Sequence, residues 1–212
     1  MFRLVPLFAI GVGIALGSPT ADELIRQIQN RYNNVRTLSV DFRMEDHHRP
    51  PEEGKLTLRK QGKMRWDYTK PAGKLFVADG KTVYLYSARD NKVEKVPLKD
   101  TEDMRAPLAF LLGRLDLRKE FANFATRPGE EESGTWLAAS AKNDRAPYER
   151  IDMLIGPDGS VHRLRVAGRD QSEIDFYFKE ERLNPPVSDK IFQFTIPPGA
   201  EVVDAIEYGA EK

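Results

Sequence analysis

"KMRWDYTKPAGKLFVADGKTVYLYS", residues 63–87, carries large apolar side chains at a density that decides how the chain can fold. Met64, Trp66 and Tyr68 alternate with charged residues, which is typical of a strand with one buried face. Residues 75–77 and 83–86 are apolar on both parities, and Asp79-Gly80 between them is a strong signal for a two-residue hairpin. The stretch therefore predicts consecutive antiparallel strands with more apolar surface than one buried face requires.

The same alternation recurs on both sides of this stretch. Val40, Phe42 and Met44 alternate with charged residues, and Leu56 and Leu58 alternate with polar ones after a proline-rich acidic connection, "HHRPPEEG". Further strand-like segments are "SARDNKVEKVPL", "GTWLAAS", "YERIDMLI", "GSVHRLRVAG", "SEIDFYFKE" and "KIFQFTI", and "GPDGS" forms a tight hairpin between two of them. About eleven short strands in hairpin order predict a mainly β protein with one wide antiparallel sheet, which must twist and curl on itself.

Two helical segments interrupt the strand pattern. "SPTADELIRQIQNRYNNVRTL" has Thr20 at its start and Glu23 three residues later, a capping-box arrangement, and its apolar residues recur at helical spacing. "TEDMRAPLAFLLGRLDL" has Pro107 near a helix start and Gly113 as a stop, which predicts a short inserted helix. These helices are expected to cover the inner face of the sheet. They could leave a cavity beneath them, or they could complete an ordinary packed core.

The first seventeen residues have the layout of a secretory signal peptide. Arg3 precedes the uncharged run "LVPLFAIGVGIAL", and "ALG" ending at Gly17 supplies small residues at the cleavage positions. An uncleaved anchor is the alternative, but the run is shorter than the roughly 20 residues of a membrane span. We expect residues 18–212 to form one domain outside the cytoplasm. The sequence holds no cysteine, so neither a disulfide nor a lipidated thiol is expected.

The balance of charge gives no reason to expect nucleic acid as a partner. Lys plus Arg and Asp plus Glu number 33 each. The basic residues Lys55, Arg59, Lys60, Lys63 and Arg65 are interrupted by apolar ones, and we expect them on the outer face of two strands.

No motif of reactive side chains stands out. His47 and His48 are adjacent, so on a strand they would point to opposite faces, and no third ligand accompanies them at a metal-binding spacing. His162 follows a hairpin and is read as a polar strand position. No serine lies in a GxSxG motif, and the acidic runs at 100–103 and 130–132 are typical of solvated loops. We therefore predict no catalytic residue, no metal and no cofactor; an enzyme acting on lipids or glycans remains an alternative.

The order of motifs along the chain resembles the outer-membrane lipoprotein carrier family (LolA-type). "RWDYTKP" followed by "FVADGKTVYLY" is similar to the signature region of that family, through Trp66, Tyr68, Pro71, Asp79, Gly80, Lys81, Tyr84 and Tyr86. The helix that runs into "TLSVDFRM" resembles the start of the family pattern, and "IGPDGSVHRLRV" with "KIFQFTIPPGAEVVD" resembles its end. The resemblance thus covers nearly all of the chain after the signal peptide.

The resemblance implies a fold and a function. The fold would be an incomplete antiparallel barrel with the helices as a lid. The function would be that of a soluble monomeric periplasmic chaperone, not an enzyme, whose hydrophobic cavity binds the acyl chains of lipoproteins. Its partners would be acylated lipoproteins, an inner-membrane ABC-type lipoprotein release complex and an outer-membrane lipoprotein receptor. Because that receptor is itself lipidated, the missing cysteine favours the carrier.

Strand parity selects the candidate site residues. The predicted lipid-binding residues are Phe42, Leu58, Met64, Trp66, Tyr68, Val77, Leu85, Ile151, Met153, Phe176 and Phe178. The predicted lid residues are Leu24, Ile28, Leu108, Leu111 and Leu112, with Lys60 as a latch. Many members of the family have an arginine and a proline where this chain has Lys60 and Gln61, so the latch would be weaker, differently built or absent. The alternative function is a periplasmic sensor or regulatory module of the same fold.

Overall fold

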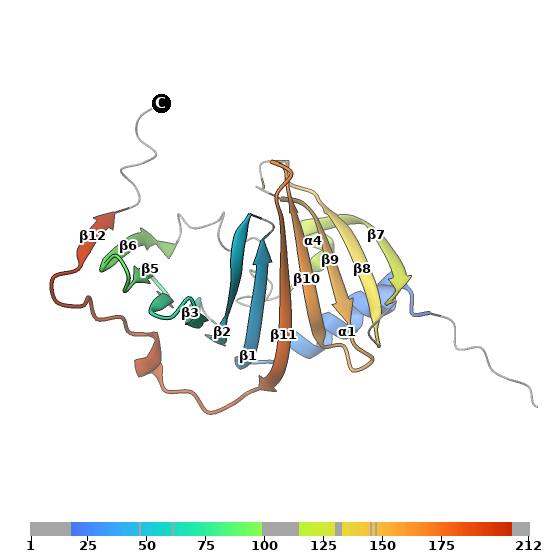
Figure 1. The fold of residues 1–212 in the computed structure, drawn as a ribbon. Coiled ribbons are helices and arrows are strands. Elements are labelled where there is room, and N and C mark those ends of the chain that lie inside the picture. The colour runs from blue at the N-terminus through green and yellow to red at the C-terminus, as the bar shows by residue number, and fades with distance from the viewer. Residues whose placement is uncertain are drawn as a thin grey trace, which may run out of the picture.

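The computed structural model describes residues 18–46, 48–60, 62–98, 115–129, 133–144, 146 and 148–204. Its main feature is a curved sheet of twelve strands in the order β12-β6-β5-β4-β3-β2-β1-β11-β10-β9-β8-β7 (Figure 1). The strands are β1 (Thr37–Asp46), β2 (Arg49–Arg59), β3 (Lys63–Lys70), β4 (Lys74–Asp79), β5 (Thr82–Ser87), β6 (Lys92–Pro97), β7 (Phe121–Pro128), β8 (Thr135–Ala141), β9 (Tyr148–Ile155), β10 (Val161–Gly168), β11 (Glu173–Leu183) and β12 (Glu201–Asp204). The predicted wide antiparallel sheet is confirmed, with one parallel pair, β12 beside β6.

Helix α1 (Ala21–Asn33) begins as the sequence predicts. The Thr20 side chain accepts a hydrogen bond from the Glu23 amide, and the Glu23 carboxylate accepts one from the Thr20 amide, which completes the capping box. The predicted inserted helix falls largely on residues 99–114, outside the described part. A one-turn helix, α4 (Leu117–Glu120), follows it directly. Neither helix is long and apolar enough to cross a membrane, among the residues that the structure describes.

Strand β2 corrects the expectation that "HHRPPEEG" is only a connection. The strand already begins at Arg49, and Asp46 of β1 lies opposite it. Pairing with β3 starts only at Glu53, so Pro50 and Pro51 lie where that side of β2 has no neighbour in the sheet. Proline is tolerated in such edge positions because no ladder hydrogen bond needs its missing N–H.

The segment "KIFQFTI" was predicted to be the last strand, and this prediction is wrong. Residues 189–192 form a 3₁₀ helix, η2 (Asp189–Phe192), which contacts β3 and β4. Residues 185–200, which include this segment, run from the end of β11 along the outside of the sheet to β12 (Figure 1). We call residues 185–200 the C-terminal strap. Arg65 donates a hydrogen bond to the Ile191 carbonyl (3.0 Å), and Arg59 donates one to the Val187 carbonyl. These arginine side chains take the place of the backbone N–H groups that would bond such carbonyls in a sheet.

The C-terminal strap explains why β4 and β5 are apolar on both faces. Phe194 packs on Tyr84 and Tyr86, with ring centroids 5.2 and 6.0 Å apart, and Phe192 is only 1% exposed. Val77 lies opposite Tyr84 and Arg65, and therefore points to this outer face, away from Trp66. The prediction that Val77 lines the inner face is wrong, because apolar residues on both parities leave the choice of face open.

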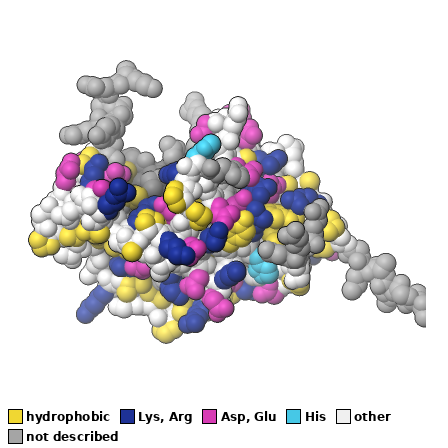
Figure 2. Space-filling model, viewed as in Figure 1, with side chains coloured by type: hydrophobic (Ala, Val, Ile, Leu, Met, Phe, Trp, Pro, Cys, Tyr) yellow, Lys and Arg dark blue, Asp and Glu magenta, His cyan; other side chains and the backbone are white. Residues whose placement is uncertain are grey.

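The rest of the outer face carries charge of both signs. Lys and Arg side chains are interspersed with Asp and Glu over the side seen in Figure 2. Four of the five basic residues singled out in the sequence lie here: Lys55 pairs with Asp41, Arg65 with Asp67, and both Arg59 and Lys63 with Asp189. Trp136 also lies on this face, between the guanidinium groups of Arg127 and Arg163, 4.7 and 5.6 Å from its ring centroid. Lys60, the fifth, points instead to the C-terminal end of α1.

Candidate functional site

The inner face of the sheet is mainly apolar. Directly opposed residues in antiparallel strands point to the same side, as Met64 does with Leu58 and Trp66 with Phe76. Ten of the eleven residues predicted to bind lipid belong to, or pack against, one apolar cluster: Phe42, Leu58, Met64, Trp66, Tyr68, Leu85, Ile151, Met153, Phe176 and Phe178. The structure therefore brings these ten together and excludes only Val77. Lipid binding by them remains a prediction.

Five aromatic rings form the centre of this face. Phe42 packs edge-to-face on Trp66 and Tyr68, with centroids 4.5 and 5.3 Å apart. Phe176 continues the row, 6.3 Å from Trp66 and 6.3 Å from Phe178. The Trp66 indole N–H points to the Met64 sulfur at 2.6 Å, so its one polar atom is bonded within the apolar cluster. We call these five residues the aromatic row; its surface is large and mainly apolar.

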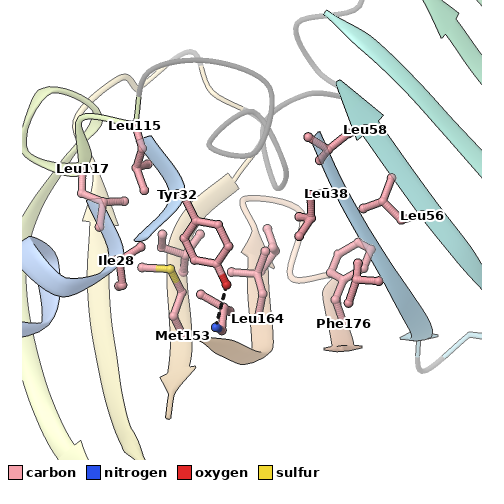
Figure 3. Packing of buried hydrophobic residues seen from close by; sticks show 14 of the residues in the cluster. Ile28, Tyr32, Leu38, Leu56, Leu58, Leu115, Leu117, Met153, Leu164 and Phe176 are labelled. Atoms are coloured by element: carbon pink, nitrogen blue, oxygen red, sulfur yellow. Dashed lines mark hydrogen bonds between the residues drawn. The ribbon is translucent and has the colours of Figure 1, made fainter. Parts of the chain in front are cut away.

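Helix α1 covers part of the inner face. Leu24 and Ile28, both predicted lid residues, are almost fully buried, and Figure 3 shows Ile28 and Tyr32 beside Met153 and Leu164 of the sheet. Leu115 and Leu117 lie next to the same helix and are also buried. The other predicted lid residues, Leu108, Leu111 and Leu112, lie outside the described residues. Within the described part, the inner face is therefore covered by α1 together with Leu115 and Leu117.

Polar bonds at its C-terminal end hold α1 in place. The Lys60 ammonium donates to the carbonyls of Tyr32 and Asn33, at 2.7 Å each, in the last turn of the helix. A cation there is favourable, because the helix dipole places negative charge at that end. Burial lowers the pKa of Lys60. The Asn33 side chain adds a pair of hydrogen bonds to the backbone of Leu115.

A second set of polar contacts ties the same end of α1 to β11. The buried Tyr32 hydroxyl donates to Glu181 (2.6 Å) and accepts from the Val161 amide (3.0 Å). Arg31 forms an ion pair with Glu181 at 2.5 Å. Burial, together with the negative charge of Glu181, raises the pKa of Tyr32, so the phenol stays protonated and remains a donor. The C-terminal end of α1 is thus fixed by specific polar contacts.

The described residues show no arrangement suited to covalent chemistry. The Ser160 hydroxyl lies 2.9 Å from His162 Nε2, but Asp158 accepts from Ser160 and is not bonded to the histidine ring. A nucleophile relay requires the carboxylate to orient the histidine, which is not the case here. Within the described ranges, no three His, Asp or Glu side chains meet as a metal site would require. His47 lies outside those ranges.

Parity reasoning missed several inner-face residues that carry the same signal. Leu56, Leu137 and Leu164 are fully buried in the cluster. Two charged residues on this face were also missed: Glu52 lies opposite Met44, and Lys74 precedes Phe76 by two residues. Their parity in the sequence predicts their face, but charged residues are usually assigned to the solvent side.

Known proteins share the sequence pattern over most of the chain. The family model described as "Outer membrane lipoprotein carrier protein LolA" matches residues 33–195. The chain belongs to the outer-membrane lipoprotein carrier protein family. A relative from Chromobacterium violaceum with the name "Outer-membrane lipoprotein carrier protein" is 28% identical over 96% of this chain and 97% of its own length. A protein of the same name from Cupriavidus taiwanensis is 30% identical over 92% of this chain and 84% of its own.

A solved structure shares the fold of the chain. The crystal structure of an uncharacterized conserved protein from Thermus thermophilus superposes with a TM-score of 0.54 at 13% identity, over 87% of this chain and 98% of that one. The resemblance to the family inferred from "RWDYTKP" and "FVADGKTVYLY" is confirmed by the family model.

Proposed function

We propose that the protein binds the acyl chains of lipoproteins on its apolar inner face and carries them through the periplasm from the inner to the outer membrane. The observation that carries this proposal is the aromatic row together with the other inner-face residues, a mainly apolar surface that α1 partly covers. Membership of the carrier family supports the same conclusion.

The physical chemistry of the cargo explains why such a surface is needed. Each buried methylene contributes roughly 0.8 kcal/mol, so an acyl chain of about sixteen carbons requires on the order of 10 kcal/mol to be exposed to water. A carrier must offset this cost and yet release the chain, which favours broad apolar contact over strong directional bonds. The aromatic row offers contact of that kind.

Cargo binding requires the inner face to become accessible. Trp66, Met153 and Ile28 are at most 5% exposed in the structure, so side chains that would touch lipid are now covered by protein. We propose that α1 moves away from the sheet when cargo enters, with Lys60 as part of the latch. The inner-membrane release complex would load the carrier, and an outer-membrane receptor would take the cargo by binding it better.

The two tryptophans give a direct test. Trp66 lies on the inner face and Trp136 on the outer face, so a bromine-labelled acyl chain bound as proposed will quench only the first. The W136F variant isolates the emission of Trp66, and W66F isolates that of Trp136. A triacylated lipopeptide with brominated chains is titrated into each variant, and native mass spectrometry gives the number of lipopeptides bound per protein.

We expect saturable quenching in W136F, little quenching in W66F and a stoichiometric complex. Equal quenching of both tryptophans would place the lipid on the surface without specificity, and no quenching with no complex would refute the proposal. Capture of a membrane-bound regulatory protein without any acylated cargo would favour the sensor module instead.

A further inference from the structure

An ion pair lies on the largely apolar inner face, beside the aromatic row. Glu52 of β2 and Lys74 of β4 reach across β3, and the Lys74 ammonium lies 2.5 Å from Glu52 Oε1. The two side chains are only 16% and 28% exposed, with Glu52 the more buried. An ion pair so largely removed from water adds little to stability compared with apolar side chains of the same size. Its presence on this face therefore calls for another role.

The pair is built into the end of the aromatic row. The Lys74 ammonium lies 4.5 Å from the centroid of the Tyr68 ring, in a cation–π contact, and Tyr68 packs edge-to-face on Phe42. Burial, and next the negative charge of Glu52, raise the pKa of Tyr68, so its hydroxyl keeps its proton. An acyl chain lying along the aromatic row would have one end next to this pair.

The pair keeps hydrogen-bonding capacity. Glu52 Oε2 is buried and has no hydrogen-bond partner, an uncommon state for a carboxylate oxygen because such atoms lose water without compensation. Lys74 has three N–H donors and also borders a hollow of about 550 Å³ that Leu85 and Glu94 line. The pair thus presents an unused acceptor and a charged donor side by side.

We propose that Glu52 and Lys74 bind the polar junction of the acylated cargo, where ester and amide groups join the acyl chains to the polypeptide. Lys74 donates to an ester carbonyl, and Glu52 Oε2 accepts from the amide N–H of the acylated terminus. This assignment rests on the proposed function and adds to it a subsite that sets the position of the cargo along the aromatic row. A free fatty acid could also use Lys74, through its carboxylate, but it has no N–H for Glu52.

Two lipopeptide probes separate this role from a structural one. The first carries an amide-linked chain and a diacylglyceryl group on its terminal cysteine. In the second, ethers replace both esters and the amide nitrogen is methylated, which removes the two ester carbonyls and the amide N–H but keeps the chains. Affinities are measured by quenching of Trp66 in the W136F background for the parent, K74M, E52Q and K74R. Lys55→Met is the matched control, because Lys55 is also on β2 and forms an ion pair (2.7 Å, with Asp41), but on the outer face.

We expect K74M and E52Q each to weaken binding of the first probe about tenfold, the usual effect of losing a hydrogen bond to a charged group. Binding of the second probe should change less than about twofold, K74R should retain most of the affinity, and K55M should change neither. An equal loss for both probes, or no loss for either, would overturn the assignment. Palmitate weakened by K74M while the first probe is unaffected would assign the pair to free carboxylates and also overturn it. Failure of the parent to bind either probe would refute the proposed function itself.

Discussion

Replacement of Lys60 by methionine tests whether α1 is a latched cover. The substitution keeps much of the aliphatic chain and removes the ammonium, and with it both 2.7 Å bonds to the carbonyls of Tyr32 and Asn33. A hydrogen bond to a charged group contributes about 1.5–3 kcal/mol, but here burial of the ammonium opposes that gain, as its lowered pKa indicates. We expect a net loss of about 2 kcal/mol for the two bonds together.

A loss of this size should appear as local opening of the helix. About 2 kcal/mol corresponds to a roughly 30-fold larger population of the open form. The contacts of Tyr32 with Glu181 and of Asn33 with Leu115 remain, so the rest of the fold should be unaffected.

Native-state hydrogen exchange of the α1 amides measures this population directly. We expect protection of residues 24–32 to fall about 30-fold in K60M, while β9 and β10 keep theirs. The K60R variant is the matched control, because arginine keeps a charged donor at the same position. Unchanged protection of α1 would refute the latch, and a uniform loss over helix and sheet would show that Lys60 supports the whole fold instead.

Three further predictions concern contacts elsewhere in the fold. Tyr32→Phe removes the bond to Glu181 and leaves the Val161 amide buried without an acceptor, so chemical denaturation should show a loss of about 2 kcal/mol with an unchanged m-value. Gly54→Ala should cost about 3 kcal/mol in the same assay, because the new Cβ would collide with the backbone oxygen of Asp67; wild-type stability would show that β2 can shift there. Burial raises the pKa of Asp175, but bonds from Arg163 and Arg165 outweigh it and the pKa is lowered overall. The stability that Asp175 contributes is therefore fully present above about pH 4 and is lost as the pH falls through the lowered pKa. The D175N variant should accordingly destabilise the protein at pH 7 and much less near pH 2. An equal effect at both pH values would contradict this.

Much of the inner face could be predicted because strand parity is a local property. Phe42, Trp66 and Phe176 each alternate with polar neighbours, so their side of the strand follows from the sequence once one face is assumed to be buried. The capping box of Thr20 and Glu23 and the Asp79-Gly80 hairpin are equally local, and the structure contains both. Glu52 and Lys74 follow the same parity, but charged residues are normally assigned to the solvent side, so their place on the inner face was not predicted.

Residues 75–77 and 83–86 are apolar on both parities, so the apolar character of both faces of β4 and β5 could be predicted. What covers the second face follows from the fold alone. Phe192 and Phe194 come from a segment about a hundred residues later, and they bury the side to which Val77 points. Arg59 and Arg65 hold that segment by its carbonyls, so "KIFQFTI" does not join the sheet despite its strand-like pattern. The physical reason is that periodicity reports which residues share a face, whereas the partner of that face is chosen by contacts between distant parts of the chain.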